Sequence, residues 1–215
     1  MSVSNSSRGI DIGFLVKPEL PYECSVKSNR KQIINYKNKT YKFSRDIPEL
    51  RLNQAGEMKM IIMGVHLKSK ISSEEDYEGM DTREAEVSGL VTNYLRLKEK
   101  YQVPILVMGD FNGFVQKDNH EHEFKQIFVK TTLVDYLDVL QSPDLDRVTY
   151  VRTNPYHLSQ LDYILIDQDL VLKVSAKSRV LRFLTFYDIE LPLPKTFAEK
   201  KQLPSDHYPQ ILILE

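Results

Sequence analysis

Short apolar segments recur along the chain and predict β-strands. They are four to ten residues long, rich in Ile, Val, Leu and Tyr, and separated by turn-forming residues. The predicted strands are Ile10–Val16, Gln32–Tyr36, Thr40–Phe43, Glu49–Leu52, Met58–Leu67, Ile105–Met108, Val148–Val151, Leu161–Ile166, Val171–Val174 and Ile211–Leu214. The continuous apolar run Ile105–Met108 is typical of a strand that is buried on both faces of its sheet.

One longer segment has the spacing of an amphipathic helix. Asp81 or Thr82 can cap its start, and Pro104 closes it. Its apolar residues recur at helical spacing: Val87, Leu90, Val91, Tyr94, Leu95 and Leu97. Shorter helices are predicted around Glu121–Phe128 and Leu133–Leu140. These elements together predict a mixed α/β sandwich in which helices cover sheets.

The length and composition of the chain fit a single domain and exclude few classes of protein. The chain has 215 residues, 41% hydrophobic and 27% charged, which fits a single domain spanning residues 1–215 and suits an enzyme or a binding module. No apolar run approaches the roughly 20 residues of a membrane span, and the N-terminus lacks a secretory signal pattern. The single cysteine, Cys24, excludes an internal disulfide framework and favours a reducing compartment such as the cytoplasm.

Charge is unevenly distributed although the net charge is −1. Seven of the 29 basic residues and no acidic residue lie between Lys27 and Arg45, so the remainder carries 22 basic against 30 acidic residues. With Tyr36, Tyr41 and Phe43 interleaved, this segment is either a solvated hairpin or a contact for a phosphate backbone. The acidic stretch formed by Glu74, Glu75, Asp76, Glu78 and Asp81 is interpreted as a solvated loop, with a cation site as the alternative.

Polar residues follow, interrupt or precede four of the predicted strands, where scaffolds commonly present reactive groups. Asp110 and Asn112 follow the strand Ile105–Met108, and their side chains point the same way if the extended geometry persists. A carboxylate beside a carboxamide can hold Mg²⁺ and orient a water or a phosphoryl oxygen. The alternative is a polar turn, where Asp, Asn and Gly are favoured in any case.

The other three segments each carry an acid, an imidazole or a cation. Asp206 and His207 precede the last strand and can supply a metal carboxylate and an imidazole. Asp162 interrupts an apolar strand and is costly to bury unless it is paired, for example with a histidine. His66 lies near the end of the strand Met58–Leu67 and Lys68 directly follows it, where they either pack in the structure or hold a phosphate.

The order of these four segments resembles the endonuclease/exonuclease/phosphatase superfamily, whose members are DNase I-like. The resemblance implies a four-layer α/β sandwich and a phosphoesterase that uses Mg²⁺ or Mn²⁺. It also implies roles for the matching residues. Asp110 and Asn112 would lie at the metal and orient the nucleophile, and Asp206 would be a further metal carboxylate. His207, held by Asp162, would act on the attacking water or the phosphate. His66 would stabilise charge on the phosphoryl oxygens, with Lys68 and Asn112 contacting substrate.

The sequence departs from the superfamily pattern near its start. Members usually open with a strand ending in Asn, a helix and a strand carrying the glutamate that is the principal metal ligand, whereas this chain begins at the segment Arg8–Val16, downstream of both. We therefore expect an N-terminally incomplete domain, weak Mg²⁺ binding and weak or absent activity of the chain alone. The incomplete sheet would favour self-association.

Two function classes remain open. The first is a metal-dependent phosphoesterase for phosphodiester or phosphomonoester substrates, with the basic segment favouring nucleic acid over a phospholipid head group or a sugar phosphate. The second is a catalytically inactive relative that serves as a binding or assembly module. A zinc site at His120 and His122 is disfavoured, because residues two apart diverge on a helix.

Overall fold

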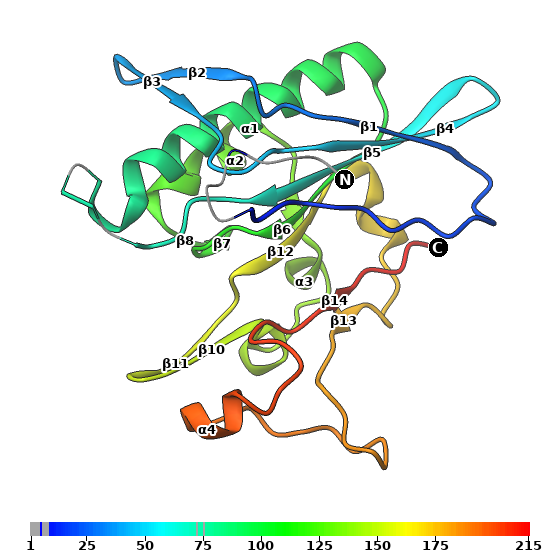
Figure 1. Ribbon diagram of the computed structural model, residues 1–215. Helices are drawn as coiled ribbons and strands as arrows, with labels where there is room; N and C mark the ends of the chain where they lie inside the picture. Colours follow the sequence, from blue (N-terminus) through cyan, green and yellow to red (C-terminus); the bar gives the residue numbers. More distant parts are fainter. Residues whose placement is uncertain (1–4, 6–8, 72, 75) are drawn as a thin grey trace.

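A six-stranded sheet forms the centre of the molecule (Figure 1). The computed structural model describes residues 5, 9–71, 73, 74 and 76–215. In order across the sheet, the strands are β1 (Glu23–Lys27), β4 (Glu49–Gln54), β5 (Glu57–His66), β6 (Ile105–Asp110), β12 (Asp162–Ile166) and β9 (Val134–Asp135). The β5–β6 pair is parallel and the other pairs are antiparallel.

Helix α1 (Met80–Tyr101) connects the parallel strands and covers one face of the sheet with α2 (Lys125–Lys130) (Figure 1). The hairpin of β2 (Ile33–Tyr36) and β3 (Lys39–Lys42) packs on α1. Gly89 permits this approach, because a Cβ atom there would lie 2.8 Å from side-chain atoms of both Ile34 and Phe43. The predicted helix before Pro104 is confirmed, but the predicted cap at Asp81 or Thr82 is wrong, because α1 begins at Met80 and both residues lie within its first turn.

Residues on the two faces of β6 and β12 belong to two hydrophobic cores. Val107 and Leu165 pack toward the α1 side, whereas Leu106 and Ile164 pack on the opposite side. This alternation is the period-two pattern of a strand that is covered on both faces. The prediction of a doubly buried strand at Ile105–Met108 is therefore confirmed for its first three residues, while Met108 is partly exposed.

The opposite face carries short elements. These are α3 (Tyr136–Val139), η3 (Asp144–Arg147), β10 (Tyr150–Thr153), β11 (Tyr156–Ser159), η4 (Gln168–Lys173), β13 (Arg179–Val180), α4 (Phe197–Lys200) and β14 (Gln210–Ile211). Strand β13 pairs with β14, and β10 pairs with β11. Between β5 and α1 lies η1 (Tyr77–Gly79), and after β6 come β7 (Val115–Gln116), β8 (Asn119–His120) and η2 (His122–Phe124). The mixed α/β fold with helices covering a large sheet is confirmed.

Several local predictions differ from the structure. The strands predicted at Val148–Val151 and Ile211–Leu214 appear as β10 (Tyr150–Thr153) and β14 (Gln210–Ile211). The segment Ile10–Val16 forms no regular strand, although Ile12 and Phe14 pack where Gly64 lacks a side chain. Residues Val171–Val174 fall mainly in η4 rather than in a strand. Asp167 caps the start of η4, because its side chain accepts a hydrogen bond from Gln168 N–H. Leu133–Leu140 divides into β9 and α3. Arg8 and Glu75 lie outside the described residues. No helix in the described part of the chain combines the length and apolar character of a membrane span.

Candidate active site

His66, Asp110 and Asp162 lie side by side across the central sheet. His66 ends β5 and is in register with Asp110, which ends the parallel strand β6. Asp162 begins β12 and is in register with Asp110 on the other side. Because side chains of laterally paired residues project from the same face of a sheet, the three residues form one row. His66 Nε2 lies 3.6 Å from Asp110 Oδ2.

The turn after β6 fixes the carboxylate of Asp110. Gly109 has φ +136°, and a Cβ atom there would lie 2.0 Å from the carbonyl oxygen of Val65, so the position requires glycine. The backbone N–H of Asn112 donates to Asp110 Oδ1 at 2.8 Å. The carboxamide nitrogen of Asn112 donates to Asp110 Oδ2 at 3.2 Å and to the carbonyl of Leu67 at 3.0 Å.

Asp110 and Asn112 come together for a reason other than the predicted one. The prediction rested on a strand that continues through Asn112, and this is wrong, because β6 ends at Asp110 and Asn112 has φ 54°. The left-handed conformation of Asn112 turns its side chain back onto Asp110. The pair therefore forms one hydrogen-bonded unit at the end of the strand.

His207 reaches the row from a separate segment and pairs with Asp162. Its Nδ1 atom lies 2.7 Å from Asp162 Oδ2. The Tyr150 ring packs on the imidazole with 5.0 Å between ring centroids, and a β-bridge pairs the two residues. Burial lowers the pKa of His207, but the hydrogen bond and charge of Asp162 raise it by a larger amount. The net pKa of His207 is therefore raised. With Nδ1 held by a carboxylate, Nε2 is left for other partners.

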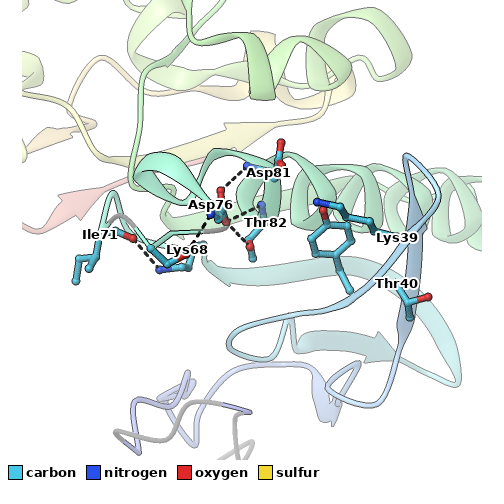
Figure 2. A pocket seen from close by; sticks show the side chains of 9 residues that line it. Lys39, Thr40, Lys68, Ile71, Asp76, Asp81 and Thr82 are labelled. Carbon is cyan, nitrogen blue, oxygen red and sulfur yellow. Dashed lines mark hydrogen bonds between the residues drawn. The ribbon is translucent and has the colours of Figure 1, made fainter.

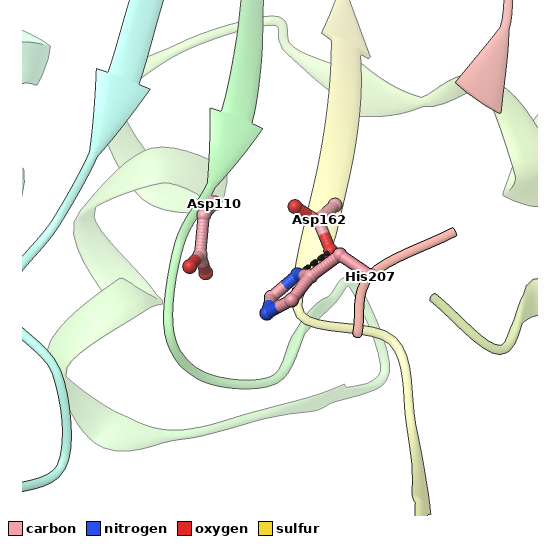
Figure 3. Close-up of side chains that lie close together, drawn as sticks. All are labelled: Asp110, Asp162 and His207. Atoms are coloured by element: carbon pink, nitrogen blue, oxygen red, sulfur yellow. Dashed lines mark hydrogen bonds and ion pairs between the residues drawn. The ribbon is translucent and has the colours of Figure 1, made fainter. Parts of the chain in front are cut away.

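The ligand atoms of Asp110, Asp162 and His207 lie within 4.8 Å of one another. Figure 3 shows Asp110 at the end of β6, Asp162 at the start of β12 and the His207 ring turned toward Asp162. Burial and, next, the charge of Asp162 raise the pKa of Asp110 to about 6. Two carboxylates this close together create a site that a divalent cation would stabilise. Carboxylate and carboxamide oxygens are donors that Mg²⁺ and Mn²⁺ accept, so Asp110 and Asn112 fit such a cation.

Solved structures share this architecture. The human Nocturnin catalytic domain with bound sulfate anion matches with a TM-score of 0.53 and 14% identity, covering 92% of this chain and 61% of that chain. Truncated Caenorhabditis elegans TDP2 matches with a TM-score of 0.50 and 14% identity, covering 88% of this chain and 64% of that chain. An endonuclease/exonuclease/phosphatase family protein from Leptotrichia buccalis matches with a TM-score of 0.50 and 15% identity, covering 92% and 72%.

The chain shares the DNase I-like α/β fold of these structures. The resemblance inferred from the sequence is thus confirmed for the fold. No protein-family profile and no curated protein matches the sequence. The chain spans less than two thirds of the Nocturnin and TDP2 chains.

Asp206 and Lys68, two further predicted site residues, lie outside the cluster of Asp110, Asp162 and His207. Asp206 has a 62% exposed side chain, and its Oδ2 atom lies 3.8 Å from Lys200 Nζ. It directly precedes His207. Among the described residues, the cluster does not include Asp206, and its role as a metal ligand stays a prediction.

Lys68 lies in a surface groove of about 670 Å³ between the β2–β3 hairpin and the start of α1 (Figure 2). Its Nζ atom donates to the carbonyl of Ile71 at 3.3 Å. The acidic stretch lines the same groove through Asp76 and Asp81. The carboxylate of Asp76 accepts the backbone N–H groups of Asp81 and Thr82 at 2.9 and 3.1 Å, so it caps the start of α1. The capping role supports the loop interpretation of the acidic stretch.

The basic segment divides between surface and interior. Lys31, Lys37, Lys39 and Lys42 are exposed. Arg45 is buried, however, and its Nη1 donates to the carbonyl of Leu67 at 2.9 Å, the same carbonyl that Asn112 uses. Arg45 therefore supports the turn that carries Asp110. Sequence reasoning treated it as one of several solvated cations, and its position directly before the acid Asp46 and an apolar pair was a weak signal of burial.

Proposed function

We propose that this DNase I-like domain is a phosphoesterase that hydrolyses phosphodiester bonds by direct attack of water. The observation that carries the proposal is the convergence of Asp110, Asp162 and His207, whose ligand atoms lie within 4.8 Å of one another although they come from three segments. The partly buried carboxylates and the carboxylate-held imidazole are groups that can carry out hydrolysis of a phosphoester.

The imidazole of His207 handles the proton in the proposed reaction. Its Nδ1–H donates to Asp162, so Nε2 accepts a proton from the attacking water as the new P–O bond forms. The charge of Asp162 stabilises the imidazolium that results. The bond to the leaving oxygen breaks on the opposite side of phosphorus, and that oxygen departs with the electron pair as an alkoxide and takes up a proton from solvent. His66, 3.6 Å from Asp110, donates to phosphoryl oxygens when it is protonated.

Asp110 and Asn112 would hold Mg²⁺ or Mn²⁺. When bound, the cation supplies Lewis-acid neutralisation of the charge that develops on the phosphoryl oxygens. Asn112 is prepared for this role because its carboxamide nitrogen is already engaged with Asp110 and Leu67, which orients the oxygen of the same group. With few protein oxygens contributed, we expect weak cation binding and slow turnover.

Nucleic acid is the substrate class that the surface charge favours. The lysines of the β2–β3 hairpin are exposed, and Lys39 lies with Tyr41 and Lys68 along the groove of Figure 2. Exposed lysines beside an aromatic ring suit a phosphate backbone with unstacked bases. A phospholipid head group or a sugar phosphate offers the same scissile chemistry without a long backbone.

The test is a hydrolysis assay on labelled single-stranded DNA, bis(p-nitrophenyl) phosphate and p-nitrophenyl phosphate, with Mg²⁺ or Mn²⁺. We expect cleavage of the diesters that is abolished by chelation and lost in His207→Ala and Asp110→Asn. His122→Ala and Asp118→Asn are matched controls because both residues are exposed, and they should retain activity. A folded wild-type chain that binds DNA without any turnover would instead support the binding-module hypothesis.

A further inference from the structure

Thr149 lies where the two segments that carry the Asp162–His207 pair meet. It directly precedes β10 and is completely buried. Its neighbour Tyr150 forms the β-bridge to His207. The sequence predicts a strand at Thr149 but does not indicate which polar groups its side chain contacts. Only the structure shows these contacts.

The side chain of Thr149 holds the backbone of the Asp162 segment. Its Oγ1 atom accepts the backbone N–H of Leu161 at 2.9 Å and that of Asp162 at 3.0 Å. A hydroxyl oxygen has two lone pairs, so both amides are satisfied by one atom. The carbonyl of Asp162 is held from the other side by Gln210 Nε2 at 2.6 Å.

The main chain of Thr149 holds the His207 segment. Its carbonyl accepts the N–H of Tyr208 at 2.8 Å, and its own N–H donates to Ser159 at 3.0 Å. Asp162 and His207 are 45 residues apart in sequence. Because no single element carries both, their separation depends on contacts that cross between the two segments, and Thr149 contacts both.

We propose that Thr149 is a positioning residue that sets Asp162 relative to His207. The inference rests on the proposed function, since it assigns Thr149 a role in that reaction. A buried threonine can also serve stability alone, through its methyl group and its hydrogen bonds. The two roles differ in what the hydroxyl does: a positioning hydroxyl keeps the Asp162 carboxylate at 2.7 Å from His207 Nδ1, so losing it changes that bond specifically.

The experiment compares Thr149→Val with Thr149→Ser in the full chain. Valine keeps the shape and removes the hydroxyl, whereas serine keeps the hydroxyl and removes the methyl group. In ¹⁵N-histidine-labelled protein, which contains five histidines, the downfield proton signal of His207 Nδ1–H reports the bond to Asp162. We expect the valine variant to lose or shift that signal and to lower kcat by roughly 10- to 100-fold with KM little changed. The serine variant should restore both.

Thr132→Val is the matched control, because Thr132 donates its hydroxyl to Asp167, a residue of neither catalytic segment. It should leave the signal and kcat unchanged. Should Thr149→Val fail to fold, Thr149→Ala and Thr149→Ser are compared instead, since both lack the methyl group and only alanine lacks the hydroxyl. An unchanged signal and kcat in the folded hydroxyl-free variant, or an equal loss in the serine variant, would overturn the proposal.

The two readouts separate this inference from the proposed function. If the wild-type chain has no turnover on any phosphoester, the proposed function fails, while the Nδ1–H signal still reports whether Thr149 positions the pair. If turnover is present and the signal does not respond to the hydroxyl, the inference fails alone.

Discussion

Asp110 and Asp162 face each other in direct register across the antiparallel pair of β6 and β12. This register places two carboxylates side by side, and each has a different imidazole neighbour: His66 Nε2 lies 3.6 Å from Asp110, and His207 Nδ1 lies at hydrogen-bond distance from Asp162. Asp162 is paired with His207 at 2.7 Å, whereas Asp110 is held by the N–H groups of Asn112. The sheet thus gives two chemically identical groups different environments, which is how one site can hold a cation and manage a proton.

Replacing Asp162 with asparagine tests the proton-handling half of this arrangement. The change keeps the side-chain size but removes the charge that stabilises the His207 imidazolium. We expect kcat to fall by roughly 100-fold or more. Thermal stability should change little, because the substitution also relieves repulsion with Asp110. The same change at the exposed Asp118 is the control, and wild-type kcat in Asp162→Asn would contradict the assignment.

A measurement of cation binding tests the proposed role of Asp110 as a metal ligand. Electron paramagnetic resonance distinguishes free from bound Mn²⁺, so a titration gives the affinity without an activity assay. We expect weak binding to the wild type and a further loss of roughly tenfold or more in Asp110→Asn, with Asp118→Asn unchanged. Equal affinities in Asp110→Asn and wild type would place the cation elsewhere.

The strands and their polar ends were predictable because their signals are local. The apolar run before Asp110 and the isolated acid Asp162 in an apolar strand each follow from a few neighbouring residues. The pairing of Asp162 with a histidine was expected on the cost of burying an unpaired carboxylate. The superfamily resemblance supplied the identity of that histidine.

The supporting contacts were not predictable, because they join segments that are distant in sequence. In the sequence Arg45 is one more cation of a basic segment. In the structure it is buried, and it donates to the Leu67 carbonyl that also accepts from Asn112. Thr149 reads as an ordinary strand residue, yet it joins two catalytic segments. Val171–Val174 shows the converse, because β-branched residues predicted a strand and the cap at Asp167 instead starts a 3₁₀-helix.

Substituting Gly109 with alanine should strongly destabilise the domain. The new Cβ atom would lie 2.0 Å from the Val65 carbonyl oxygen in the neighbouring strand, so β5 and β6 would have to separate. We expect a loss of about 3 kcal/mol or more in the free energy of unfolding, measured by urea denaturation. Gly56→Ala is the control: Gly56 has φ +79°, and a Cβ atom there would have no neighbour within 4 Å, so backbone strain alone should cost about 1 kcal/mol. Equal losses would exclude the steric explanation.

Glu49 makes the central sheet sensitive to acid. This buried carboxylate in β4 accepts hydrogen bonds from Asn29 at 3.0 Å, Arg51 at 2.5 Å and Arg96 at 2.9 Å. Burial raises the pKa of Glu49, but the hydrogen bonds from Asn29 and Arg51 lower it by a larger amount. The net pKa therefore lies below its ordinary value of 4.5. Glu49→Gln should therefore lose about 2 kcal/mol of unfolding free energy at neutral pH, where the charged hydrogen bonds are intact.

The sign of the pH dependence follows from the lowered pKa. As pH falls through 4.5 the unfolded chain takes up a proton at Glu49 before the folded chain does, so folding loses the stabilisation that this carboxylate provides at higher pH. The difference in unfolding free energy between wild type and Glu49→Gln should accordingly shrink below pH 4.5. Urea denaturation across this range measures it. Glu57→Gln is the control, because its pair with Lys59 is exposed and such pairs contribute little. A difference that stays constant with pH would show that Glu49 acts through packing rather than charge.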